Sequence, residues 1–195
     1  MPHKDRLVLC GPFGSGKTEI AKVWAALTGG RILSFADPIR AQVAELLVPK
    51  HTYSNYESWT SDIDAIIRKM EDPETKDEFR GLLQELGKYR TRQDSEYWVR
   101  RFADRYTSVT TSNRPASCGD CRLDNQMELL KSWGFTFVLL DPTGSPHVRD
   151  QGDRQNDETE QYWPHWEYDH VLDYQEGVMV QARRLIHEFG INGSL

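Results

Sequence analysis

The stretch Arg6-Leu-Val-Leu-Cys10 followed by Gly11-Pro-Phe-Gly-Ser-Gly-Lys-Thr18 decides the fold class of this chain of 195 residues. Its first five residues form an apolar, partly β-branched run that stops at glycine, which is typical of a buried parallel strand. The next eight match the pattern G-x-x-x-x-G-K-[S/T] and lead into apolar residues at helical spacing up to Leu27. The order of strand, glycine loop and helix is the context in which this pattern binds phosphate.

The chemistry of this loop predicts ATP and Mg²⁺ as cofactors. Glycines let successive backbone N–H groups converge on phosphate oxygens, and the helix that starts near Gly16 adds its positive dipole end. Lys17 would reach the β and γ phosphates, and the Thr18 hydroxyl would ligate Mg²⁺. A glycine turn that only joins strand to helix is the alternative, and it leaves the lysine and threonine in register unexplained. The residues expected to bind ATP here are Gly11, Phe13, Gly14, Ser15, Gly16, Lys17 and Thr18.

The rest of the chain predicts an α/β fold with a doubly wound parallel sheet, because strand and helix patterns alternate. Further strands are expected at 31–36, 115–120, 135–140 and 170–172. Helices are expected at 16–27, 37–47, 62–70, 74–89, 94–106, 123–133 and 175–189, with a loop at 50–60. We predict a single domain, 1–195, in which about 50–110 form a helical insertion and about 141–169 a lid-like loop.

Composition limits the protein's surroundings and partners. The net charge of -6 argues against duplex DNA as a partner, because such binding needs many Lys and Arg side chains on the phosphates. Three cysteines without a paired framework predict free thiols and a reducing cytoplasm. No stretch approaches the roughly 18 apolar residues of a membrane helix, so we expect no membrane partner and a cytoplasmic protein.

Further stretches occur in the order known from one family. They are Ser34-Phe-Ala-Asp-Pro38, Leu83-Gln-Glu-Leu-Gly87 with Arg92 and Trp98-Val99 beyond it, and Asp120-x-Arg122-x-x-Asn125. Together with the glycine loop, they make the chain resemble bacteriophage deoxynucleoside monophosphate kinases, which are P-loop kinases, from about residue 6 to 140. The resemblance implies transfer of the ATP γ-phosphate to a deoxynucleoside monophosphate, in the host cytoplasm if a phage encodes the protein.

This resemblance, with the chemistry of each side chain, implies an acceptor site formed by Phe35, Asp37, Arg40, Gln84, Arg90, Arg92 and Arg122. Asp37 would orient the acceptor phosphate or the waters of the metal, and an ordinary N-cap before Pro38 is the alternative. For Arg40 and Gln84, the alternative to a role in the acceptor site is a side chain that simply faces solvent. Arg92 best matches the arginine of the family, but Arg90 competes with it because Lys88-Tyr89-Arg90 departs from the family pattern.

Asp120 is expected to end the third strand, from where a Walker-B-type carboxylate holds Mg²⁺ through water, so Thr18 and Asp120 form the expected metal site. Arg122 suits phosphate through its bidentate fork, and a turn-forming aspartate with a surface arginine is the alternative. Arg149 and Arg154 of the lid-like loop would reach the ATP phosphates, unless that loop is simply solvated. Catalysis is assigned to Lys17, Asp37, Asp120 and Arg122.

The expected function is therefore a deoxynucleoside monophosphate kinase with small-molecule nucleotides as partners, and a homodimer is left open. A kinase of the same fold that acts on dephospho-coenzyme A or on a modified base within phage DNA is the nearest alternative. A nucleotide-binding switch that transfers nothing is the alternative from another class.

Overall fold

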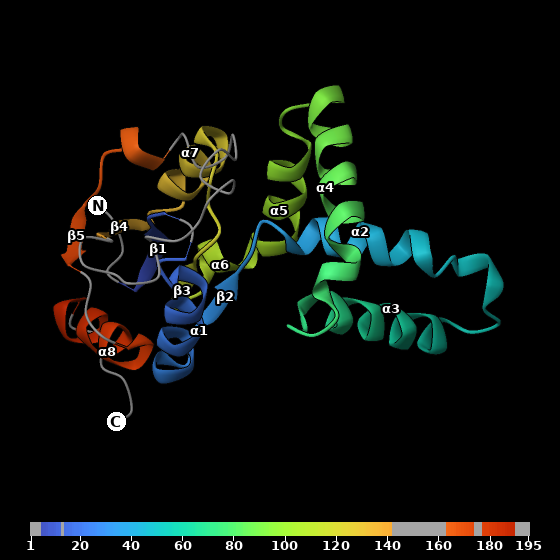
Figure 1. The fold of residues 1–195 in the computed structure, drawn as a ribbon, viewed down its shortest axis with the longest axis horizontal. Coiled ribbons are helices and arrows are strands. Elements are labelled where there is room, and N and C mark those ends of the chain that lie inside the picture. Colours follow the sequence, from blue (N-terminus) through green and yellow to red (C-terminus); the bar gives the residue numbers. More distant parts are fainter. Residues whose placement is uncertain (1–4, 13, 142–162, 174–176, 190–195) are drawn as a thin grey trace. The chain divides into compact units, whose positions relative to one another are not determined.

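The computed structural model describes residues 5–12, 14–141, 163–173 and 177–189. The chain forms two compact units, of which the first combines Met1–Ser34 with Tyr106–Leu195 and the second is the segment Phe35–Arg105. All strands of the described residues belong to the first unit, and the second is helical (Figure 1). The helical insertion expected at about 50–110 falls largely within the second unit, which begins earlier, at Phe35.

The first unit contains a five-stranded sheet in which every neighbouring pair is parallel. Its strands are β1 (Arg6–Cys10), β2 (Arg31–Leu33), β3 (Ala116–Cys118), β4 (Thr136–Asp141) and β5 (His170–Asp173). The order across the sheet is β2-β3-β1-β4-β5. The central strand β1 is buried along its whole length, as its apolar sequence predicts. The expected α/β class with a parallel sheet is confirmed.

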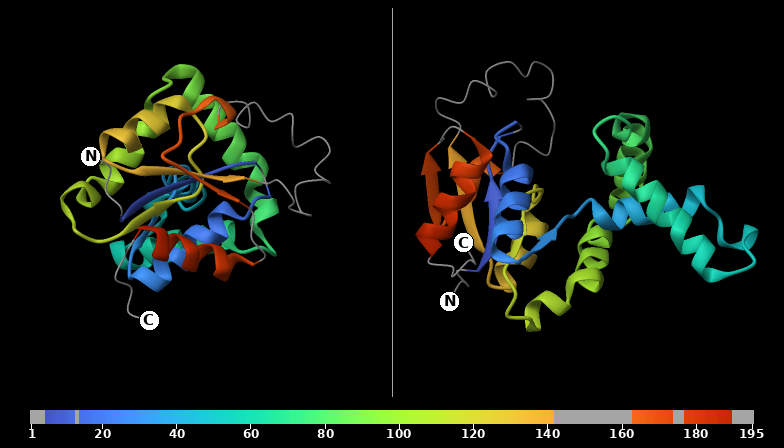
Figure 2. Two further views of the ribbon diagram at one scale, coloured as in Figure 1. Left: turned by 90° about the vertical axis from the view of Figure 1, so that its left-hand side faces the viewer. Right: turned by 90° about the horizontal axis from the view of Figure 1, so that it is seen from below.

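Helices cover both faces of this sheet. Helix α7 (Asp124–Ser132) lies over one face, and α1 (Lys17–Thr28) and α8 (Val178–Phe189) lie side by side over the other (Figure 2, left). The core between α1, α8 and the sheet contains the fully buried side chains of Leu7, Trp24, Val138, Leu172 and Leu185. Burying such side chains contributes about 1.5–3 kcal/mol each, so the glycine loop is anchored at both of its ends by core elements.

The second unit is formed by α2 (Asp37–Leu47), α3 (Tyr56–Glu71), α4 (Lys76–Gln93) and most of α5 (Tyr97–Tyr106). Buried Val43, Ala44 and Met70 form its core together with partly buried apolar residues of α3 and α4. The remaining short helices of the described residues are η1 (Lys50–Thr52), α6 (Ser108–Thr111) and η4 (Trp163–His165). In the part of the chain that the structure describes, no helix has the length and apolar character that a bilayer crossing requires.

Two helix ends differ from the sequence prediction, the start of α3 and the end of α4. Helix α3 begins at Tyr56, within the expected loop, because the Asn55 side chain accepts a hydrogen bond from the Ser58 N–H at 2.8 Å. Helix α4 continues to Gln93, past the end expected at residue 89, and the Thr91 hydroxyl donates a hydrogen bond to the Gly87 carbonyl at 2.9 Å. The predicted loop was therefore wrong from residue 56 onwards, and the predicted end of the helix at residue 89 was too early.

Candidate functional site

Three strand ends converge at one edge of the sheet. Strands β2, β3 and β1 are neighbours, and the register places Cys118 opposite both Leu33 and Val8. Because the strands are parallel, the segments that leave them start at the same, carboxyl edge, where ligands bind in open α/β sheets. These segments carry Ser34 after β2, Asp120 after β3 and the Gly11–Thr18 loop after β1.

The backbone of this loop requires glycine at specific positions. Gly11 has φ of 140°, and a Cβ atom there would lie 2.8 Å from the carbonyl oxygen of Leu140 at the end of β4. Gly16 has φ of 77° in the left-handed region and immediately precedes helix α1. Both glycines are therefore needed for the chain to leave β1, pass the end of β4 and enter α1.

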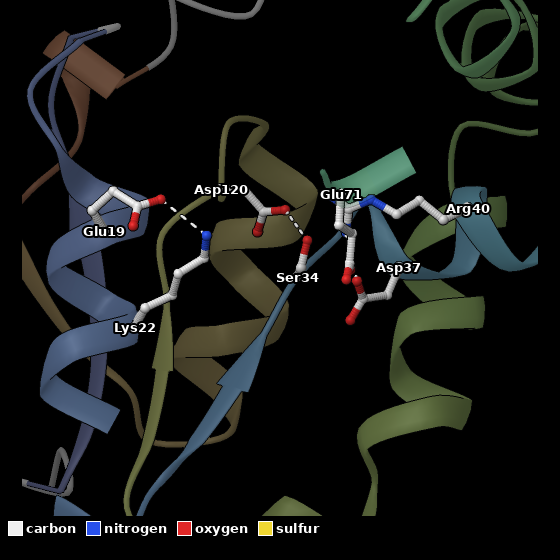
Figure 3. Close-up of polar contacts among 7 residues, drawn as sticks. All are labelled: Glu19, Lys22, Ser34, Asp37, Arg40, Glu71 and Asp120. Atoms are coloured by element: carbon white, nitrogen blue, oxygen red, sulfur yellow. Dashed lines mark hydrogen bonds and ion pairs between the residues drawn. The ribbon is translucent and has the colours of Figure 1, made fainter. Parts of the chain in front are cut away.

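The Lys17 ammonium lies folded over the loop that precedes it. Its Nζ donates hydrogen bonds to the carbonyl oxygens of Gly11 at 2.7 Å and Pro12 at 2.6 Å, and to the Ser15 hydroxyl at 3.3 Å. The positive charge is thereby held against the backbone of the loop, at the carboxyl edge of the sheet. Lys22 of the same helix instead pairs with Glu19 on the exposed surface (Figure 3).

Asp120 lies beyond the end of β3, not at its last residue, because the strand stops at Cys118. One of its carboxylate oxygens accepts a hydrogen bond from the Ser34 hydroxyl at 2.5 Å (Figure 3), and the other accepts from the Cys118 thiol at 3.4 Å. The preceding residue, Gly119, packs so closely that a Cβ there would lie 3.1 Å from Lys17 O and Thr18 Cα. Asp120 is therefore oriented next to the first turn of α1.

These residues fit a magnesium-bound triphosphate. Within the described residues no side chain caps the start of α1, and the start of a helix is a place where anions bind. The same residues contain no cluster of three His, Cys, Asp or Glu side chains suited to a metal ion. Beside phosphates, Mg²⁺ commonly takes phosphate and water oxygens with one or two protein groups, and Thr18 and Asp120 are the groups that would serve here.

Arg122 is positioned by the cap of α7. The buried Gln126 side chain accepts hydrogen bonds from the backbone N–H groups of Arg122 at 2.9 Å and Leu123 at 3.3 Å. At the other side of the helix start, Asp124 accepts from the indole of Trp166 at 2.7 Å, and the Trp166 ring packs edge-on against Phe137. The aromatic stretch around Trp166 thus contributes packing to the sheet, and Arg122 remains half-exposed on a fixed turn.

The second unit contains the remaining predicted acceptor residues that the structure describes. Asp37 is the first residue of α2 and Ala36 precedes it at the cap, so the N-cap alternative for Asp37 is wrong. Its carboxylate instead pairs with Arg40 at 2.7 Å, and Arg40 also lies 3.4 Å from Glu71 (Figure 3). Phe35 is buried and stacks on Phe102 with ring centroids 3.8 Å apart, which makes it part of the packing of this unit.

The candidate residues of α4 differ in burial. Gln84 and Arg92 are exposed, whereas Arg90 is half-buried and its guanidinium lies 5.1 Å from the centre of the Tyr97 ring. The other predicted nucleotide-binding residues, Phe13, Arg149 and Arg154, lie outside the described residues. Ser34, which holds Asp120, was not among the predicted site residues, although the stretch that begins with it was singled out; only the strand order places its hydroxyl at Asp120.

The three cysteines are free, as predicted from their number, and all three are buried. Burial raises the pKa of the Cys10 thiol to about 12, although the nearby Lys17 charge acts in the opposite direction. Burial also raises the pKa values of Cys118 and Cys121 well above the ordinary range. These thiols therefore stay protonated in the folded protein at neutral and mildly alkaline pH.

A measurable pH dependence of stability follows from these thiols. An unfolded thiol titrates near ~8.5, so above that pH the unfolded chain loses protons that the folded chain keeps, and the free energy of unfolding falls towards pH 12. We expect a loss of about 1 kcal/mol per thiol by about pH 9.5. Urea unfolding at a series of pH values measures it, with Cys10→Ala as the comparison. A stability that does not fall between about pH 7.5 and 9.5, or a fall equally steep in Cys10→Ala, would contradict this origin.

Comparison with models of known protein families finds no match, and comparison with curated proteins finds no match either.

Proposed function

We propose that this chain is an ATP-dependent, magnesium-dependent P-loop kinase that transfers the γ-phosphate of ATP to a deoxynucleoside monophosphate, giving a deoxynucleoside diphosphate and ADP. The residues of the glycine loop and Asp120 support the part of this proposal that concerns ATP and Mg²⁺ most strongly. The resemblance to bacteriophage deoxynucleoside monophosphate kinases supports the second half, the acceptor.

The observation that carries the proposal is the Lys17 ammonium held over a glycine loop at the carboxyl edge of a parallel sheet, beside an oriented carboxylate. Lys17 Nζ lies 2.7 Å from Gly11 O and 2.6 Å from Pro12 O, and Asp120 is fixed by Ser34 at 2.5 Å. A turn that only joined strand to helix would need neither the folded lysine nor the carboxylate. A triphosphate needs the lysine to neutralise its negative charge, and its metal ion needs the carboxylate to neutralise its positive charge.

In the proposed reaction the protein supplies positioning and charge. The loop N–H groups and the start of α1 would bind the phosphate oxygens, and Lys17 would exchange its loop carbonyls for the β and γ phosphates. Thr18 and Asp120 would hold Mg²⁺, Asp120 through water. When bound, ATP and Mg²⁺ supply the transferable phosphoryl group and the neutralisation of its charge. Transfer needs no covalent bond to the protein, so no nucleophilic side chain is assigned.

The proposed acceptor residues of the second unit are Asp37, Arg40 and one arginine of α4, Arg90 or Arg92; Arg122, in the first unit, is proposed separately as a phosphate ligand. Asp37 and Arg40 already form an ion pair at 2.7 Å. An acceptor nucleotide near this pair would offer Arg40 other oxygen atoms, and the Asp37 carboxylate would then accept a hydrogen bond from the acceptor or from water. This arrangement gives Asp37 and Arg40 coupled roles, so their effects on transfer are expected to be non-additive.

An acceptor panel tests the proposed function directly. The full chain is incubated with ATP and Mg²⁺ and with each deoxynucleoside and ribonucleoside monophosphate, and ADP release and the new diphosphate are measured. We expect ADP release above the background without acceptor for at least one deoxynucleoside monophosphate, matched by equal diphosphate formation.

Other outcomes of the panel identify the competing functions. ATP turnover that is the same with every acceptor would favour the nucleotide-binding switch over the kinase. Phosphate transfer to dephospho-coenzyme A or to modified phage DNA, and to no monophosphate, would keep the kinase chemistry and replace the acceptor. Absence of nucleotide binding by the folded protein with Mg²⁺ present would overturn the proposal as a whole.

A further inference from the structure

A half-buried arginine of the second unit has no anionic partner. Arg90 on α4 forms no ion pair within the described residues, and its Nε is buried without a hydrogen-bond acceptor. By contrast, Arg40, Arg80 and Arg100 of the same unit each pair with a carboxylate. Two tyrosine rings give its charge a cation–π contact but give its Nε no acceptor, and a buried donor without an acceptor is costly.

A second guanidinium approaches the same aromatic ring. Arg90 lies 5.1 Å and Arg101 lies 5.6 Å from the centre of the Tyr97 ring, and Arg90 also lies 5.9 Å from that of Tyr89. Tyr97 and Arg101 are four residues apart on α5, which places them on one face of the helix. Helix α4 thus contributes one positive charge and α5 the other.

The ring itself is held in place by other residues. The Tyr97 hydroxyl donates a hydrogen bond to Gln42 of α2 at 3.3 Å, and the ring packs edge-on against the buried Trp98, whose indole donates to the Gly87 carbonyl at 3.1 Å. Burial raises the pKa of the Tyr97 hydroxyl, but a hydrogen bond from Arg101 and the charges of both arginines outweigh burial and lower it. The acidic groups that act on Arg101 are Glu45 and Asp104; no carboxylate of the described residues pairs with Arg90.

We infer that Arg90 and Arg101, arranged around Tyr97, form the binding site for a phosphate monoester dianion. This inference rests on the proposed function, in which that monoester is the phosphate of the acceptor nucleotide. Two planar guanidinium forks provide paired hydrogen bonds to phosphate oxygens, and a dianion relieves the repulsion between the two like charges. Tyr97 is held in place by Gln42 and Trp98, and its ring fixes the positions of the two guanidinium groups. The exposed Arg92, which best matches the family position, is not part of this site.

Binding measurements test this site without requiring any transfer. Calorimetry on the full chain without ATP, at constant ionic strength, compares inorganic phosphate, a deoxynucleoside monophosphate and the nucleoside that lacks the phosphate. We expect the wild type to bind phosphate and to prefer the monophosphate over the nucleoside by about tenfold or more. Arg90→Gln and Arg101→Gln should each reduce this preference to near unity.

Arg100→Gln is the matched control, because it removes the same charge from the same helix one residue away, where the charge pairs with Asp94. It should keep the preference within about twofold. Because Arg90 also packs, Arg90→Lys is the second variant: it keeps the charge, loses the fork and should lose most of the preference. Circular dichroism shows whether each variant is folded.

The outcomes separate this inference from the proposed function. A wild type that binds neither phosphate nor any monophosphate, or a preference lost in Arg92→Gln or Arg100→Gln but kept in Arg90→Gln and Arg101→Gln, would overturn the site. Phosphate binding that depends on Arg90 and Arg101 in a protein that transfers to no acceptor would uphold the site and remove the kinase. If Arg90→Gln and Arg101→Gln both transferred phosphate and bound the monophosphate normally, the kinase would be upheld and this phosphate site would be overturned.

Discussion

Lys17→Ala is expected to lower the rate of phosphate transfer by about 10²- to 10³-fold. The ammonium already lies over the loop, within 2.7 Å of Gly11 O and 2.6 Å of Pro12 O. Bound phosphates would replace these carbonyl oxygens as its partners, and alanine removes the charge without a substitute. Initial rates at saturating ATP and acceptor, with nucleotide binding measured in parallel, give the loss in transfer and in affinity.

Lys22→Ala is the control for this experiment. It removes an equal charge from the same helix, but at an exposed position where the lysine pairs only with Glu19 (Figure 3). It should leave the transfer rate within about twofold and stability within about 0.5 kcal/mol. Transfer by Lys17→Ala at a rate close to that of Lys22→Ala would remove Lys17 from the reaction.

Asp120→Asn is expected to reduce transfer by about 10²-fold and to shift the dependence on Mg²⁺ to higher concentration. Asparagine has nearly the same shape and can still accept the Ser34 hydrogen bond, so the variant mainly loses the negative charge. A titration of the rate with Mg²⁺ at fixed ATP measures both effects.

Ser34→Ala provides the complementary change. It removes the 2.5 Å hydrogen bond to Asp120 and keeps the carboxylate charge, so we expect a loss of only a few-fold, caused by looser positioning of Asp120. If Ser34→Ala were as damaging as Asp120→Asn, the hydrogen bond and not the charge would be the important feature. In that case Asp120 would be a structural residue and the metal would be held elsewhere.

Local patterns predicted the elements nearest to the candidate site well. The run Arg6–Cys10 is strand β1 as expected, and α1 runs from Lys17 to Thr28, close to the predicted 16–27. Both predictions succeeded because an apolar run bounded by glycine and a helical apolar stripe are local signals. Prediction was poorer for 50–60, where the side chain of Asn55 caps the start of a helix in a polar, aromatic stretch, and beyond residue 89, where α4 runs on to Gln93.

By itself, the sequence determined that the chain contains a strand, a glycine loop and a helix with Lys17 and Thr18 in register, because each of these depends on neighbouring residues. Only the tertiary structure decided that β3 lies between β2 and β1, and this order brings Ser34 to Asp120 across 86 positions of sequence. Closer in sequence, the short connection between α4 and α5 and the hydrogen bond from the Trp98 indole to the Gly87 carbonyl set Arg90 beside Tyr97, while Arg92, two positions further along α4, is exposed. The physical reason is that pairing between distant strands and helices depends on the burial of whole faces, which no short window of sequence contains.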